Sequence, residues 1–284
     1  MKVHYECLSC IVNQSQKVVE LSTEDVEKRK AAMIKAAKFL GEHFDYNAIP
    51  AILGSQVFLM LYDYLGNNDP FEGYKTRSNL LAKSLVEDLK KKLDIELESA
   101  LKLSIAGNVI DFAVGYNPEK IEEDIMKMVD EELYVDKSME LFESLKKAKT
   151  LLYLTDNCGE VYFDRLFLET IKDEFPELKI YIAAKEGPII NDATVKDLLR
   201  ADFDELGEVI STGSRIVGVP PQGLSPTFLR VFREVDVIIA KGQGNFETLS
   251  EFGDKRVFYL LKAKCPPIAR ELEVPRGAMV CTRH

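Results

Sequence analysis

The feature that most constrains the fold is a change of pattern near residue 149, where short apolar runs begin. TLLYL, KIYIAA, VDVIIA and RVFYLL are rich in β-branched residues and tyrosine. Amphipathic helical segments such as VYFDRLFLETIKDEF separate several of these runs. Near-continuous apolar strands that alternate with helices are typical of a mostly parallel sheet covered on both faces. We therefore predict an α/β domain, of the α/β/α type, over residues 149–284.

The preceding residues carry helical patterns instead, and no convincing strand pattern appears among them. Ser22 followed by Asp25 predicts a capped helix start for the segment STEDVEKRKAAMIKAAKFLGEHF. We predict a helical domain over residues 1–148, packed on the α/β domain. Further helical patterns occur in IPAILGSQVFLMLYDYLG, SNLLAKSLVEDLKKKL, ESALKLSIAGNVIDFAVG, EKIEEDIMKMVDEEL and SMELFESLKKA.

Charge and composition exclude several classes of protein. The 284 residues carry a net charge of −10, spread along the chain, and the basic run 90–92 lies beside acids. Binding to a nucleic-acid backbone needs a basic stripe, so we expect no nucleic-acid partner. The start of the chain lacks the apolar core of a signal peptide, and no apolar run approaches ~18 residues. Five scattered cysteines form no disulfide framework. We expect a cytoplasmic protein without a membrane partner.

The ends of the four predicted strands hold the candidate functional residues. Carboxyl ends of parallel strands gather at one sheet edge, which is where such folds bind ligands. The first strand leads into Asp156 and Asn157 with a turn at Gly159, and the second leads to Asp192. The third is followed by Lys241, Gly242, Gly244, Asn245 and Glu247, and the fourth by Lys262, Lys264 and Cys265.

These residue types favour phosphoryl chemistry at a divalent cation. Carboxylate and amide oxygens suit Mg²⁺ or Mn²⁺, and lysines with helix N-termini suit a phosphate group. Taken singly, each feature has a simpler explanation. Asp-Asn and Asp192 are good turn or N-cap residues, and GQGNFE lacks the third glycine of a dinucleotide fingerprint. What favours a site is that all four strand ends converge.

The motifs also resemble a known family. DNCGE, IINDA, GQGNFE and K-x-K-C, in this order, resemble the metal-dependent damage-control phosphatases, also called domain of unknown function family eighty-nine. CLSC and AGNVIDFAV look like its CxxC-bearing microbial branch. The resemblance spans nearly the whole chain. It implies a phosphatase for small phosphorylated metabolites such as sugar phosphates, dependent on Mg, Mn, Co or Ni. It also implies Asp156, Asn157 and Asp192 as metal ligands and catalytic residues.

The resemblance assigns substrate-side roles as well. Lys262 matches a lysine that binds the substrate phosphate, and Asn245 matches a polar site residue. Asn108 and Asp111, which share a helical face at i and i+3, match a helix that faces the active site. A buried pair that bridges the domains explains them equally well. We add Lys241, Lys264 and Glu247 as substrate-binding candidates. The eukaryotic branch has Arg-Thr where this chain has residues 259–261, Tyr-Leu-Leu, so substrate preferences do not transfer.

Two alternative functions stay open at this point. A relative described as a carboxyl methyltransferase suggests S-adenosylmethionine, although the turn after the first strand holds a single glycine. A non-catalytic metabolite-binding protein is the other alternative. Cys7 and Cys10 form a C-x-x-C that we interpret as two packed thiols, because one pair cannot complete a tetrahedral zinc site. Neither the physiological substrate nor the oligomeric state follows from the sequence.

Overall fold

A single mixed sheet organises the protein, whose computed structural model describes residues 1–107 and 118–283. Among these residues, seven strands follow the order β1-β7-β6-β5-β2-β3-β4, and only β6 and β7 pair antiparallel. The predicted α/β class with a mostly parallel sheet is therefore confirmed. The strands are β1 (Val135–Asp136), β2 (Thr150–Leu154), β3 (Lys179–Ala184), β4 (Glu208–Ser211), β5 (Val237–Lys241), β6 (Val257–Lys262) and β7 (Met279–Arg283).

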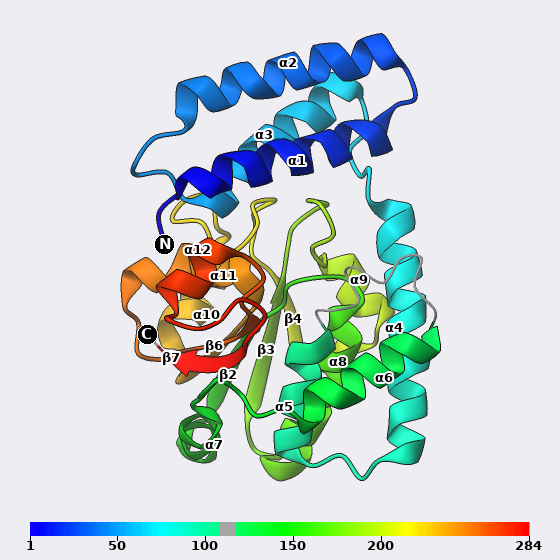
Figure 1. Ribbon diagram of the computed structural model, residues 1–284. Helices are drawn as coiled ribbons and strands as arrows, with labels where there is room; N and C mark the ends of the chain where they lie inside the picture. The colour runs from blue at the N-terminus through cyan, green and yellow to red at the C-terminus, as the bar shows by residue number, and fades with distance from the viewer. Residues whose placement is uncertain (108–117, 284) are drawn as a thin grey trace.

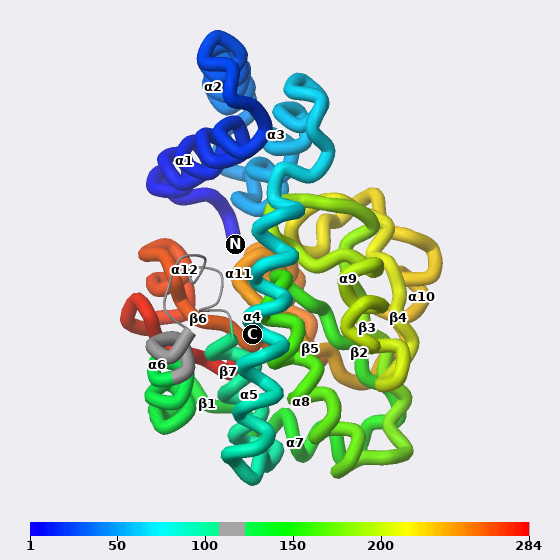
Figure 2. Tube along the Cα trace, turned by 90° about the vertical axis from the view of Figure 1, so that its right-hand side faces the viewer, coloured from blue at the N-terminus to red at the C-terminus, as the bar shows by residue number. Residues whose placement is uncertain are grey.

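Helices cover both faces of this sheet, and a further helical layer lies beyond one end of it (Figure 1, Figure 2). The helices of the described residues are α1 (Tyr5–Ser22), α2 (Val26–His43), α3 (Pro50–Leu65), α4 (Glu72–Lys92), α5 (Leu97–Ala106), α6 (Pro118–Asp130), α7 (Ser138–Lys147), α8 (Glu160–Glu174), α9 (Val195–Arg200), α10 (Pro226–Glu234), α11 (Gly242–Leu249) and α12 (Pro266–Glu271).

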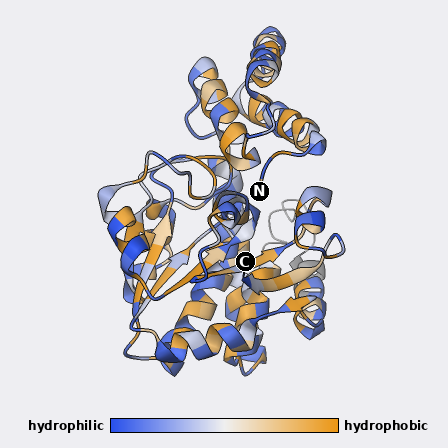
Figure 3. Cartoon of the chain, turned by 90° about the vertical axis from the view of Figure 1, so that its left-hand side faces the viewer, coloured by the Kyte–Doolittle hydropathy of each residue, from blue (hydrophilic) through white to orange (hydrophobic). Residues whose placement is uncertain are grey.

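Alternate residues of the central strands enter two different cores. In β2, Leu151 and Tyr153 join the core formed with α4, α5, α7 and α8, whereas Leu152 and Leu154 join the core formed with α10, α11 and α12. Side chains alternate across a strand, so a strand buried on both faces reads as a continuous apolar run. Figure 3 shows the resulting pattern, with hydrophobic strands between helices that are hydrophilic on the outside.

The first three helices form a layer with a core of its own. α1, α2 and α3 stack above the loops that follow β3 and β4 (Figure 1). Their core includes Leu53 and Leu61 of α3 and takes in Ile189 from the loop after β3. The remaining helices before residue 148 share the core of the sheet instead, through residues such as Leu101 and Leu141. The N-terminal layer is thus attached at the carboxyl ends of the strands.

Several details differ from the sequence-based expectations. The four predicted strands correspond to β2, β3, β5 and β6, but β1, β4 and β7 were not predicted. Asp25, not Ser22, caps α2: its carboxylate accepts hydrogen bonds from the backbone N–H groups of Glu27 and Lys28, while Ser22 ends α1. None of the described helices combines the length and the apolar character needed to cross a bilayer.

Candidate active site

The corner after β2 places an acid and an amide side by side. Asp156 and Asn157 are 8% and 6% exposed, and the Asn157 Nδ2 donates to Asp156 Oδ2 at 2.8 Å. Gly159, at φ +84°, turns the chain into α8, and its N–H donates to Asn79 Oδ1 at 2.6 Å. A position with a positive φ directly before a helix favours glycine, which has no Cβ to clash with the backbone. The corner is therefore fixed both by its own turn and by α4.

The corner after β3 meets it directly. The backbone N–H of Ala193 donates to the Asp156 carbonyl oxygen at 2.8 Å, and the N–H of Cys158 donates to the Asn191 carbonyl oxygen at 2.9 Å. Asn157 and Asp192 form an isolated antiparallel bridge. Asp192 itself is 1% exposed. The structure thus brings the three residues proposed as metal ligands together from two neighbouring corners.

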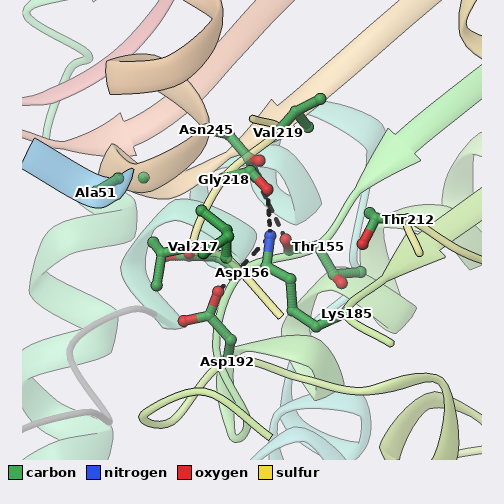
Figure 4. Close-up of polar contacts among 12 residues, drawn as sticks. Ala51, Thr155, Asp156, Lys185, Asp192, Thr212, Val217, Gly218, Val219 and Asn245 are labelled. Carbon is green, nitrogen blue, oxygen red and sulfur yellow. Dashed lines mark hydrogen bonds and ion pairs between the residues drawn. The ribbon is translucent and has the colours of Figure 1, made fainter. Parts of the chain in front are cut away.

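Lys185 is a site residue that the sequence reasoning missed. It directly follows β3 and is buried; its Nζ lies 3.7 Å from Asp192 Oδ2 and donates to the Gly218 carbonyl oxygen at 2.7 Å (Figure 4). Burial lowers the pKa of Lys185, and the carboxylates of Asp192 and Asp156 oppose that shift. The available signal was its position, a lysine at the end of a predicted strand.

The start of α11 supplies a third corner, which touches Asp156. Gly242 has φ +75°, and a Cβ at this position would lie 1.9 Å from Asp156 Oδ2. The Asp156 carboxylate therefore packs directly against the backbone of Gly242, in space that the side chain of any other residue would fill.

Asn245 lies on the same helix and is buried. Its Nδ2 donates to the Lys241 carbonyl oxygen at 2.7 Å and to the Thr155 carbonyl oxygen at 3.3 Å. Its Oδ1 has no hydrogen-bond partner within the part of the chain that the structure describes. A buried acceptor without a partner is costly, so this oxygen fits a ligand donor, a water or a cation. Asn245, Lys185 and Asp192 appear together in Figure 4.

The assignment of Lys241 to substrate binding needs correction. Its side chain is fully buried, and its Nζ donates to the Ser104 carbonyl oxygen at 2.9 Å, to Glu160 Oε1 at 2.7 Å and to Asp164 Oδ1. An ammonium group has three N–H donors, and these contacts use all of them. Lys241 therefore has no donor left for a phosphate group in this conformation.

The remaining candidates are spread around the site. Lys262 is partly buried, with its Nζ 3.4 Å from Met128 Sδ, and Lys264 donates its backbone N–H to Gln243 Oε1 at 2.7 Å. Glu247 lies near the start of α3, where burial raises the pKa of its carboxyl to about 7 although it accepts from the Ala51 N–H. Asn108 and Asp111 lie outside the described residues.

The donor set can be tested against a divalent cation. In the described ranges, no three His, Cys, Asp or Glu side chains gather as a metal-binding group. Asp156, Asp192 and Asn157 offer two carboxylates and one amide, which are hard oxygen ligands of the kind Mg²⁺ and Mn²⁺ prefer. The buried Lys185 ammonium lies 3.7 Å from Asp192 Oδ2, so the carboxylates of this corner already attract one cationic group. The residues fit such an ion.

Comparison with solved structures first defines the class of fold. The chain superposes on the crystal structure of a DUF89 family protein from Pyrococcus horikoshii with a TM-score of 0.96 and 57% identity, covering 100% of this chain and 99% of that one. The sheet order and the helical layer described above are therefore those of a DUF89 protein.

Sequence comparison then names the family. The damage-control phosphatase ARMT1-like domain matches residues 3–280, and the chain belongs to this family, as its motifs predicted. It is 57% identical over 284 residues to a damage-control phosphatase of Pyrococcus horikoshii, covering 100% of this chain and 99% of the relative. It is 31% identical over 287 residues to a damage-control phosphatase of Archaeoglobus fulgidus, with 99% and 98% covered.

Proposed function

We propose that this protein is a divalent-metal-dependent phosphatase that hydrolyses small phosphorylated metabolites, sugar phosphates or related damaged compounds among them. The observation that carries the proposal is the meeting of Asp156, Asn157 and Asp192, all buried, at the carboxyl ends of β2 and β3. Relatives at 57% and 31% identity bear the name damage-control phosphatase, which supports the same reaction class.

Asp156, Asn157 and Asp192 would hold the cation, for which Mg, Mn, Co and Ni are the candidates. A bound divalent ion supplies Lewis-acid polarisation of a phosphoryl oxygen and lowers the pKa of water. The protein contributes burial, since carboxylates shielded from solvent bind a cation more strongly than exposed ones do. Asp156 is held by the Asn157 amide and by Gly242, which suits a fixed ligand better than a mobile nucleophile.

Lys185 and Lys262 are the cations we assign to the substrate phosphate. Lys185 already lies among the carboxylates, and Lys262 ends β6 at the same sheet edge. Positive charge placed before the reaction stabilises the charge that develops on the equatorial oxygens. Lys264 follows on the same loop and stays a candidate. The unpartnered Oδ1 of Asn245 is positioned to accept from a substrate hydroxyl.

The test is a screen of phosphorylated metabolites against Mg²⁺, Mn²⁺, Co²⁺ and Ni²⁺, with phosphate release as the readout. Asp156→Ala is expected to abolish metal-dependent release while the fold persists by circular dichroism. Asp173→Ala, which removes an exposed acid from α8, is the matched control and should retain activity. Full activity in Asp156→Ala would refute the assignment. Binding of metabolites without release of phosphate in the presence of any of these metals would favour the non-catalytic alternative. Binding of S-adenosylmethionine would favour the methyltransferase.

A further inference from the structure

We propose that Glu160, held in place by Lys241, is a positioning residue that fixes which end of the Asn157 amide faces the cation. This inference rests on the proposed metal site. Asn157 differs from its two neighbours in the ligand set because an amide presents an oxygen on one side and N–H donors on the other. Only one of its two orientations can offer oxygen to a metal, so something must select it.

The hydrogen bonds of Asn157 provide that selection. Its Nδ2 donates to Asp156 Oδ2 at 2.8 Å and to Glu160 Oε2 at 3.3 Å. An amide nitrogen has two hydrogens, and two carboxylates accept them. In the flipped orientation the amide oxygen would face both carboxylates, which is repulsive. The Oδ1 atom is consequently turned away from Asp156 Oδ2 and Glu160 Oε2, so the end of the amide left for a cation is the oxygen.

Glu160 is itself held by a buried charged network. Its Oε1 accepts from Lys241 Nζ at 2.7 Å, and the same ammonium donates to Asp164 Oδ1. Tyr153 donates its hydroxyl to Asp164 at 2.8 Å. All four side chains are at most 1% exposed. Buried ion networks contribute little net stability, so we attribute this network to holding Glu160 in a fixed position beside the site.

A neutral amide at position 160 tests the idea directly. In Glu160→Gln, the carbonyl oxygen of the introduced side chain would remain with Lys241, which places the introduced NH₂ group against the Asn157 NH₂ group. Two donors cannot satisfy each other, so the Asn157 amide should rotate and turn nitrogen toward the cation. Asp164→Asn is the matched control, because it likewise replaces a carboxyl partner of the same lysine with an amide, without touching Asn157.

Titration calorimetry with Mn²⁺ on the full-length protein measures the effect independently of turnover. We expect Glu160→Gln to weaken Mn²⁺ binding at least tenfold, and Asp164→Asn to stay within about threefold of the wild type, a loss of under about 0.7 kcal/mol. Thermal unfolding of both variants separates lost affinity from lost fold. Wild-type affinity in Glu160→Gln, or an equal loss in Asp164→Asn, would overturn the proposal. A wild-type protein that binds no Mn²⁺ would instead defeat the metal site itself.

A double-mutant cycle keeps the proposal testable if Glu160→Gln folds poorly. In the Asn157→Asp background, position 157 offers only acceptors, so an amide at position 160 becomes a suitable donor partner and the native Glu160 a repulsive one. Glu160→Gln should therefore weaken Mn²⁺ binding when residue 157 is Asn and preserve or strengthen it when residue 157 is Asp. A change in Mn²⁺ affinity that reverses its sign between the two backgrounds would show that residues 157 and 160 are energetically coupled, as contacting residues are. Equal weakening in both backgrounds would show that only the charge of Glu160 matters.

Discussion

The Asp156 carboxylate and the backbone of Gly242 are in closer contact than any other amino acid at position 242 would permit. A Cβ there would lie 1.9 Å from Asp156 Oδ2, and the φ of +75° is unfavourable for side chains. Two effects of substitution therefore need separating: local backbone strain and displacement of the carboxylate. Gly223 has nearly the same φ, +78°, and no atom within 4 Å of an added Cβ.

Gly242→Ala should consequently lose activity, whereas Gly223→Ala should keep it. Both changes carry a strain of about 1–2 kcal/mol, but only the first moves a proposed ligand. A displacement on the order of 1 Å at a reacting centre costs about 100-fold in rate. The comparison is made on metal-dependent phosphate release at equal folded fraction. Similar losses in both variants would attribute the effect to strain alone.

Glu247 makes the stability of the protein depend on pH. Burial raises the pKa of this carboxyl from 4.5 to about 7, so the folded protein holds the proton more tightly than the unfolded chain does. The associated stability is fully present below about pH 4.5 and is lost as pH rises through about 7, with an upper bound of about 3 kcal/mol.

Glu247→Gln should therefore stabilise the protein relative to the wild type at pH 8 and have little effect near pH 4.5. The neutral amide avoids the cost of burying an ionised group. Urea unfolding of both proteins between pH 4.5 and 8 measures the difference in the free energy of unfolding. A difference that stays constant across this range would contradict the pKa assignment.

At the residue scale, the sequence predicted that Asp156, Asn157 and Asp192 would meet, but it did not indicate which lysine would lie beside them. Asp156, Asn157 and Asp192 follow the ends of adjacent strands, so topology alone gathers them. Lys185 and Lys241 also stand at strand ends and look equivalent in sequence. The two lysines differ in their tertiary contacts. Glu160 and Asp164 of α8 form ion pairs with Lys241, whereas Lys185 lies beside Asp192.

At the scale of elements, strands buried on both faces could be predicted from the sequence, whereas short edge strands could not. β2, β3, β5 and β6 are apolar runs because helices cover them on each side. β4 (EVIS) is a short edge strand with a polar start, and β1 has two residues, so neither produces a pattern. Helix boundaries depend on which polar side chain reaches the free N–H groups, as Asp25 does in place of Ser22.

The contact between α3 and the loop after β3 joins the N-terminal layer to the site. The Ile190 N–H donates to the Tyr62 hydroxyl oxygen at 2.9 Å, two residues before Asp192. The Val217 N–H likewise donates to Ser55 Oγ at 2.9 Å, next to Gly218, which binds Lys185. α3 therefore holds both loops that carry groups around the carboxylates.

Tyr62→Phe should loosen this attachment without unfolding the protein. The change leaves the partly buried Ile190 N–H without its partner, at a cost of at most about 1–3 kcal/mol. Hydrogen exchange at residues 189–192 is expected to accelerate, and metal affinity to fall. Tyr46→Phe, at a tyrosine that is 95% exposed, is the control and should change neither. Unchanged exchange in Tyr62→Phe would show that the loop is held by its other contacts.

For the whole molecule, packing divides the chain differently from secondary structure. The sequence showed helices up to residue 148 and an α/β pattern beyond it, yet α4, α5 and α7 pack in the core of the sheet. An amphipathic helix reveals that it has a buried face but not what covers that face. The layer with a separate core, α1 to α3, packs on the loops that carry the carboxylates. A change in the stability of these loops should therefore also change the stability of that layer.

Metal binding should therefore stabilise the entire protein rather than the site alone. A ligand that binds only the folded state adds about 2.7 kcal/mol at a concentration 100-fold above its Kd. At about 2 °C per kcal/mol for a chain of this size, the expected rise in Tm is roughly 5 °C. Differential scanning calorimetry with Mn²⁺ and with EDTA measures it in the wild type, in Asp156→Ala and in Asp173→Ala.

The pattern across these three proteins decides where the ion binds. Asp173→Ala should show the full rise, because the exposed acid on α8 lies away from the proposed ligands. Asp156→Ala should show little or none, because it lacks one of the two carboxylates proposed to hold the ion. An equal rise in Asp156→Ala would place the stabilising ion elsewhere, on a chain whose net charge of −10 offers many weak sites. Salt screens weak binding at the surface strongly and binding at a buried site much less. The rise in Tm of the wild type should therefore persist in ~0.5 M NaCl.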